Sequence, residues 1–399
     1  MTTMLDKRPA LHPDVLLSRP LLRGPTEVCL IKDLRTGKAF EVAAREQFLI
    51  RRLDGTRTLA EIGDEYAERF GRRLGDGNWQ QLLRLLHGRG LLAGAPPGPS
   101  AGGGRPATVP AIEAAHRRLR FLLTRAVAVP LTALVLAMLV LLAWHAGELG
   151  RGVWWLLRHG RWLVAAVALA GLSAALHELA HGVVARHCGA AVTRVSLVTL
   201  HCQVEDYLYL RSRSRQVTIA LVGALVNAAV LVPLTAVWLA LAPGSAPRAA
   251  LAGLLAIGAV QALLNLVPLP PLDGYRALGH ALDTSRLATE SRRFLRLAAG
   301  RLVGRGKGTA AYPRRARVIY TGYGLTAITL YAALLTGVLL LGRWLAIDTL
   351  GSSVVLIAVV AVFMTLAGWL ARPDRSGRPP LLTRLRRART APHVESRQS

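Results

Sequence analysis

Cysteine is scarce in this sequence, and the few cysteines present show no pairing pattern. Only Cys29, Cys188 and Cys202 occur among 399 residues, and no two of them have the C-x-x-C spacing of a thiolate metal site. A disulfide framework is therefore not expected, and the thiols are expected to be reduced and cytosolic. The N-terminus also lacks the basic-then-apolar order of a secretory signal peptide, which predicts an uncleaved chain whose first hundred residues stay in the cytosol.

Acidic residues are also few. The chain carries 23 Asp and Glu against 50 Lys and Arg, a net charge of +27, yet 52% of its residues are hydrophobic. Charge kept outside long apolar runs is typical of a multi-span membrane protein, because a charge in hydrocarbon is costly. Nucleic-acid binding is the alternative for so basic a chain. The basic runs flank apolar segments, as anchoring to a lipid bilayer requires, so no nucleic-acid partner is expected.

The apolar runs beyond Arg125 approach the length of about 20 residues that crosses a bilayer. They predict six spans, at residues 126–146, 162–185, 217–241, 249–272, 318–341 and 353–371. Eleven basic residues lie between Arg276 and Arg317, and eight arginines follow Ala371. The positive-inside rule places both segments in the cytoplasm. We therefore expect a multi-pass protein of the cell membrane with both termini cytoplasmic.

Residues before the first span form a separate soluble pattern. A hairpin is predicted at Glu27 to Val42, turned at Arg35-Thr36-Gly37, and three short amphipathic helices follow. The fold class expected is mainly α, a six-span helical membrane protein with an N-terminal winged-helix (α+β) domain. The predicted divisions are residues 1–93 for the soluble domain, 94–124 for a flexible linker and basic juxtamembrane segment, 125–372 for the membrane domain and 373–399 for a basic cytosolic tail.

The second predicted span contains the sequence His177-Glu-Leu-Ala-His181, an HExxH motif. Residues four apart share one face of a helix, so the two imidazoles can bind one Zn²⁺. Glu178 then lies beside the metal-bound water and is the candidate general base. The alternative is three ordinary polar residues near a helix end. Ionisable groups within a span are costly unless they ligate, pair or catalyse, which favours the metal site.

A second motif closes the fourth predicted span, Asn265-Leu-Val-Pro-Leu-Pro-Pro-Leu-Asp-Gly274. Its prolines break helical hydrogen bonding and Gly274 permits a tight turn, so the backbone can direct the Asp273 carboxylate inward. Asp273 is therefore the expected third ligand of one Zn²⁺ per chain. Taken alone, Pro-Leu-Asp-Gly could be a simple turn at a membrane boundary. In the expected topology, however, both motifs approach the cytosolic face.

These residues resemble the site-2 protease family of intramembrane zinc metallopeptidases, which pairs HExxH with NxxPxxPLDG on a later span. Residues 162–274 carry the resemblance, and residues 195–215 are similar to its peptide zinc metalloprotease branch. Gly223-Ala-Leu-Val-Asn227 resembles the family's GPxxN segment, with Ala224 in place of proline. The resemblance implies that Asn227 or Asn265 binds substrate, although a structural hydrogen bond would serve either residue equally well.

The soluble domain resembles the PqqD-like winged-helix domains that recognise leader peptides of ribosomally made, modified peptides. The similarity rests on Leu53-Asp-Gly-Thr-Arg-Thr-Leu-Ala-Glu-Ile62 and on the closing Leu85-Leu-His-Gly-Arg-Gly-Leu-Leu92. It implies that a peptide adds as a strand to the hairpin edge. The alternatives are a DNA-binding winged helix or a domain that only packs on the membrane part. Four acidic residues between Leu59 and Phe70 argue against DNA.

Together the motifs predict an integral-membrane zinc metallopeptidase that cuts a ribosomally made peptide precursor, as leader removal or maturation. The precursor is then its substrate, and a peptide exporter or modifying enzymes are further candidate partners. Two alternatives stay open. One is regulated intramembrane proteolysis of a membrane-tethered regulator, and the other is a non-catalytic peptide-binding or immunity protein.

Overall fold

The computed structural model describes residues 3–95, 107–196, 201–210, 212–302, 304 and 309–346. The predicted sixth span at 353–371 and the predicted tail at 373–399 lie outside this range. The chain divides into two compact units that do not follow its order. Residues 1–102 and 282–399 form the first unit, and residues 103–281 form the second.

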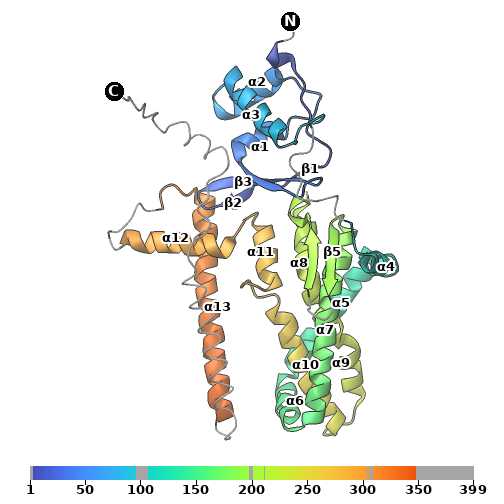
Figure 1. Cartoon of the computed structure of the whole chain (residues 1–399). Helices are drawn as coiled ribbons and strands as arrows, with labels where there is room; N and C mark the ends of the chain where they lie inside the picture. Colours follow the sequence, from blue (N-terminus) through green and yellow to red (C-terminus); the bar gives the residue numbers. More distant parts are fainter. Residues whose placement is uncertain are drawn as a thin grey trace, which may run out of the picture. The chain divides into compact units, whose positions relative to one another are not determined.

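The first unit begins with a small antiparallel sheet (Figure 1). Its central strand is β3 (Thr26–Asp33), which β4 (Ala39–Ala43) pairs along one side. The other side is shared by β1 (Val15–Leu17) and β2 (Leu21–Arg23). Gly37, at a φ of +69°, provides the left-handed residue in the turn between β3 and β4. The predicted hairpin is thus confirmed.

Three helices pack on this sheet, as the amphipathic patterns predict. They are α1 (Ala44–Ile50), α2 (Leu59–Phe70) and α3 (Asp76–Gly88). Helix α2 begins at a capping box, in which the Thr58 hydroxyl accepts from the Glu61 amide and the Glu61 carboxylate accepts from the Thr58 amide. Leu59 and Ile62 are fully buried in the core with Trp79. The domain is therefore α+β, and its winged-helix assignment stays a prediction.

Two further helices complete the first unit. Helix α12 (Leu287–Leu302) packs against α13 (Arg314–Ala346), with Phe294, Tyr312 and Tyr320 forming an aromatic cluster between them. From Arg314 to Leu340, α13 is long and apolar enough to cross a membrane. This stretch contains most of the predicted fifth span.

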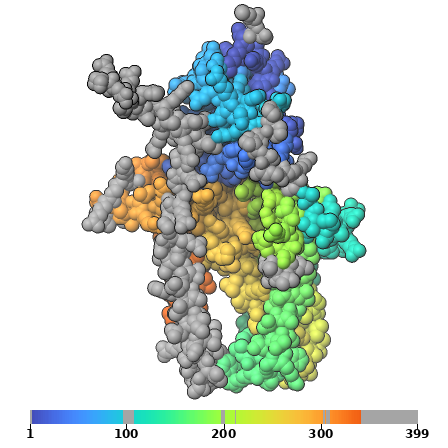
Figure 2. All heavy atoms as spheres, in the orientation of Figure 1, coloured from blue at the N-terminus to red at the C-terminus, as the bar shows by residue number. Residues whose placement is uncertain are grey.

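The second unit is built from helices and one small hairpin. Its elements are α4 (Pro110–Leu119), α5 (Arg125–Trp144), α6 (Ala146–Arg158), α7 (Gly160–His187), β5 (Ala191–Ser196), β6 (His201–Glu205), α8 (Arg213–Ala229), α9 (Leu231–Ala240), α10 (Ala246–Leu264) and α11 (Asp273–Ala281). Figure 2 shows α4, in teal, projecting beside the yellow-green hairpin of β5 and β6, where the Val109 amide donates to the Val192 carbonyl.

Among the described residues, five helical stretches are long and apolar enough to be membrane spans. Four of them belong to the second unit: α5, α7, the consecutive helices α8 and α9, and α10. These stretches overlap the first four predicted spans, although α10 ends at Leu264 rather than at Leu272, so the chain is mainly helical with candidate membrane-spanning helices. The third stretch breaks at Val230, where Pro233 cannot donate the hydrogen bond that a helix would direct to Ala229.

Two segments are more helical than the sequence predicted. The segment from Gly147 to Arg161, expected to be a loop, contains α6, and the juxtamembrane part of residues 94–124 contains α4. Gly152 is the residue at which α6 packs directly on α10. A Cβ on Gly152 would lie 2.4 Å from the Gly253 nitrogen. Glycine therefore permits a close helix crossing here rather than a turn.

Candidate metal centre

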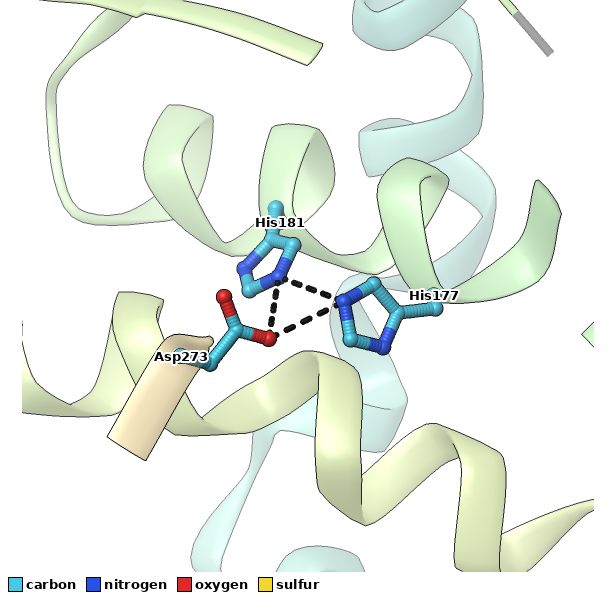
Figure 3. A group of neighbouring side chains, drawn as sticks. All are labelled: His177, His181 and Asp273. Atoms are coloured by element: carbon cyan, nitrogen blue, oxygen red, sulfur yellow. Dashed lines mark hydrogen bonds and ion pairs between the residues drawn. The ribbon is translucent and has the colours of Figure 1, made fainter. Parts of the chain in front are cut away.

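Three side chains from two distant motifs converge at one point of the second unit (Figure 3). The Nε2 atoms of His177 and His181 lie 3.1 Å apart, and Asp273 Oδ2 lies 3.0 Å from the first and 3.2 Å from the second. All three residues are buried. The convergence of His177, His181 and Asp273 predicted from the sequence is therefore what the structure has.

Helix α7 supplies both histidines, and their spacing of one helical turn brings the rings together. Helix α8 approaches His177 closely at Gly223. A Cβ on Gly223 would lie between 2.4 and 2.6 Å from three atoms of the His177 ring, far inside van der Waals contact. The glycine thus provides the space in which the His177 imidazole stands.

A backbone hydrogen bond orients the second histidine. His181 Nδ1 lies 2.6 Å from the Ile219 carbonyl oxygen on α8. Because a carbonyl only accepts, this contact requires the proton on Nδ1 and leaves the Nε2 lone pair directed at Asp273 and His177. A second hydrogen bond of this kind is common behind metal-binding histidines. His177 Nδ1 is buried and has no hydrogen-bond partner among the described residues.

A loop between α10 and α11, closed by a backbone hydrogen bond, positions Asp273. The helix ends at Leu264, and the Gly274 amide then donates to the Asn265 carbonyl at 2.7 Å, which closes the proline-containing segment. A Cβ on Gly274 would lie 2.0 Å from the Leu266 carbonyl oxygen, so only glycine fits. The other carboxylate oxygen of Asp273 lies 3.6 Å from the Arg276 guanidinium.

The three facing atoms suit a small divalent cation. Bonds of 2.0 to 2.1 Å to zinc in a tetrahedral arrangement place neighbouring ligand atoms about 3.3 Å apart, and the three separations of 3.0 to 3.2 Å come close to that value. Two imidazoles and one carboxylate also form a ligand set that leaves a fourth position open. This group could hold a metal ion, and it is the only such group among the residues described.

Glu178 follows the first histidine directly on α7 and is partly exposed. Its carboxylate is near the Cys202 thiol of β6. Burial raises the pKa of that thiol to about 12, and the negative charge of Glu178 adds to the shift. Glu178 is thus a partly exposed carboxylate next in the chain to a buried ligand group.

The two asparagines proposed to bind substrate have different surroundings. The Asn227 side chain is 1% exposed, and its Oδ1 accepts a hydrogen bond of 3.0 Å from Ser173 on α7. Its Nδ2 is buried without a hydrogen-bond partner among the described residues. Asn265 is half-buried, and its carbonyl closes the Asp273 loop. Both asparagines therefore make hydrogen bonds within the protein. These bonds do not test whether either residue binds substrate, which stays a prediction.

Sequence reasoning missed the supports of the site. Ile219 and Ser173 are ordinary span residues in the sequence, and nothing in the pattern marks the Ile219 carbonyl as the partner of His181. Gly223 was noticed only as part of a resemblance. A glycine within an apolar helix was the available signal, since such a residue often marks a close approach of another element.

No protein-family model, no curated protein and no solved structure matches this chain.

Proposed function

We propose that the chain is an integral-membrane zinc metallopeptidase that cuts a ribosomally made peptide precursor. The observation that carries this proposal is the buried triangle of His177, His181 and Asp273, with a carboxylate next to it in the chain. Two imidazoles and a carboxylate are donors that suit zinc, and such a group within a candidate span has a high energetic cost unless it binds something.

Each residue has a distinct part in the proposed reaction. The imidazoles and the Asp273 carboxylate hold the ion, which when bound supplies Lewis acidity and a water of lowered pKa. Glu178 accepts a proton from the attacking water and passes it to the amine that leaves when the peptide bond breaks. The hydrogen bond from His181 to Ile219 keeps the ring in the tautomer that binds the ion.

The proposed cleavage takes place near the cytosolic surface of the membrane. In the proposed topology α7 runs toward the cytoplasm, and His177 lies about 13 Å along the helix from Arg186 at 1.5 Å per residue. Basic residues beyond the spans keep both termini cytoplasmic in this proposal. A peptide made on ribosomes would then reach the site from the side on which it is synthesised.

The N-terminal domain is proposed to recognise the precursor. Within the described part of the chain, β4 pairs with β3 on one side only, so its other edge can accept an added strand. Backbone hydrogen bonds along such an edge give affinity, and neighbouring pockets select side chains. The acidic α2, with Glu61, Glu65 and Glu68, suits a peptide better than a phosphate backbone.

Substitution of Glu178 tests the proposed chemistry. Glu178→Gln keeps the size of the side chain but removes the base, so it should retain zinc and lose cleavage by at least about a hundredfold. The assay follows a precursor peptide, tagged at both ends, co-expressed with the full-length chain. Glu395→Gln makes the same change of charge in the C-terminal tail, at a residue that has no part in the proposed reaction, and should leave cleavage unchanged. Undiminished cleavage by Glu178→Gln would overturn the proposed mechanism.

A further inference from the structure

The N-terminal sheet continues into a segment that lies far along the chain. Leu22 of β2 donates its amide to the Asp283 carbonyl at 2.7 Å and accepts at its own carbonyl from the Ser285 amide at 3.0 Å. Leu22 and Thr284 thus form a parallel bridge on the side of β2 that faces away from β3. We call residues 282–285, a short segment that makes this single bridge, the clamp strand. It belongs to the same compact unit as the sheet.

Side chains fix the clamp strand in place. The Asp283 side chain is 9% exposed and accepts from the Arg19 guanidinium at 2.9 Å. Arg315 of α13 also donates to the Leu282 carbonyl at 2.9 Å, and its guanidinium lies 3.8 Å from Glu27 of β3 and 4.0 Å from Asp283. A partly buried ion pair with additional hydrogen bonds has a better defined geometry than an exposed pair on the surface.

The backbone of the clamp strand confirms that its shape is imposed by these contacts. Asp283 has a φ of +50° and Arg286 a φ of +56°, in the left-handed region that residues with a side chain seldom adopt. Such residues persist where the surroundings over-determine them. Nearby, Gly24 also has a positive φ, and a Cβ there would come within 3.1 Å of the buried Glu290 carboxylate. Gly24 of the N-terminal domain and Glu290 in the first turn of α12 therefore pack closely against each other.

The clamp strand lies next to a metal-ligand helix in the sequence. It follows α11 directly, and α11 is a helix of nine residues that begins at the ligand Asp273. The chain therefore connects the first unit to the second at two places, before α4 and between α11 and the clamp strand. A second connection raises the effective concentration of one unit near the other.

We propose that the clamp strand holds the N-terminal domain in a fixed place on the segment after α11, so that a peptide bound by the domain is presented to the metal centre. The presentation rests on the proposed function; the strand pairing does not. Arg19 and Asp283 are then positioning residues, acting through the domain rather than on the reacting atoms. Because one edge of the sheet is occupied by the clamp strand, the β4 edge is left for the peptide.

Removal of one backbone donor tests the proposal. Ser285→Pro deletes the amide that bonds to Leu22 while Ser285→Ala keeps it, and the Ser285 hydroxyl has no hydrogen-bond partner among the described residues. Hydrogen exchange on the full-length chain in lipid nanodiscs reports the pairing directly. The Leu22 amide should be protected in the wild type and in Ser285→Ala, and should exchange at least about tenfold faster in Ser285→Pro.

Kinetics with two probes tests the presentation. The probes are a tagged precursor peptide and the same peptide without its leader. Ser285→Pro should raise KM for the full precursor at least about tenfold with kcat nearly unchanged, and should leave cleavage of the leaderless peptide as in the wild type. Ser285→Ala should match the wild type on both. Asp283→Asn, which removes the ion pair but suits a positive φ, should give an intermediate KM.

The outcomes separate the two ideas. An unprotected Leu22 amide in the wild type would overturn the strand pairing, whatever the catalytic result. Lost protection in Ser285→Pro with unchanged KM for the full precursor would overturn the presentation. If the wild type cleaves neither probe, the presentation fails together with the proposed function, and the exchange result alone then decides the pairing.

Discussion

Gly223 offers a sharp test of how the site is built, because its substitution adds one methyl group beside a ligand. In Gly223→Ala the new Cβ would lie 2.4 Å from Cε1, 2.5 Å from Nε2 and 2.6 Å from Nδ1 of His177. Carbon atoms in contact stand about 3.5 Å or more apart, so the ring must retreat by about 1 Å. Distances from ligands to zinc tolerate only about 0.2 Å. The His177 bond to the ion should therefore be broken or severely weakened.

The expected size of the effect follows from known supports of zinc ligands. Loss of a supporting contact lowers metal affinity about 10 to 100-fold, and displacement of the ligand itself should reach at least the upper value. A hundredfold change corresponds to about 2.7 kcal/mol. Intrinsic helix propensity acts in the opposite direction, since alanine is about 1 kcal/mol more favourable than glycine within a helix. A loss of zinc in this variant would thus arise from the clash.

The assay is a zinc competition titration of the purified, folded protein against a chelator of known affinity. Gly171→Ala is the matched control, because Gly171 lies in the same helix as His177 and a Cβ there meets nothing within 4 Å. The control should bind zinc as the wild type does. Equal zinc affinity in Gly223→Ala and wild type would refute the reasoning, since it would show that His177 is not held against α8 when the ion is bound.

Two further predictions concern the loop that contains Asp273 and the ion pair between Glu113 of α4 and Arg186 of α7. Gly274→Ala should also lose zinc, because its Cβ would lie 2.0 Å from the Leu266 carbonyl oxygen; retained stoichiometric zinc would contradict the closed loop. Glu113 has a lowered pKa, chiefly through its hydrogen bonds with Arg186 of α7. The pKa of Glu113 is lower in the folded chain than in the unfolded chain, where it is about 4.3. The ion pair therefore stabilises the packing of α4 on α7 above that pH, and this stabilisation is lost as the pH falls through the lower folded-state pKa. A fluorescent probe on α4 should report a local loosening of the helix as the pH falls through that lower value, and Glu113→Gln should remove that pH dependence; an unchanged transition in the variant would exclude the pair as its cause.

The ligand group could be predicted from the sequence because its parts are local motifs. His177 and His181 share a helix face by their spacing alone, and the prolines before Asp273 indicate where the helix must end. The apolar runs likewise predicted the described spans, since length and hydropathy are properties of a segment by itself.

Contacts that depend on distant backbone could not be predicted. The Ile219 carbonyl behind His181 and the pairing of Leu22 with Thr284 leave no trace in residue type, because any residue provides the same backbone groups. Helix α6 was missed because it lies between two predicted spans and is too short to be one itself. Only the close approach of Gly253 shows that Gly152 is a packing residue.

The proposed function requires one zinc ion bound by two imidazoles and one carboxylate from separate motifs. X-ray absorption spectroscopy of the purified full-length chain, together with its metal content, tests this coordination. We expect one zinc per chain, coordinated by two imidazole nitrogens and by oxygen, with the bound zinc lost in His181→Ala and Asp273→Ala. A protein without zinc, or a coordination shell that is unchanged in Asp273→Ala, would contradict it.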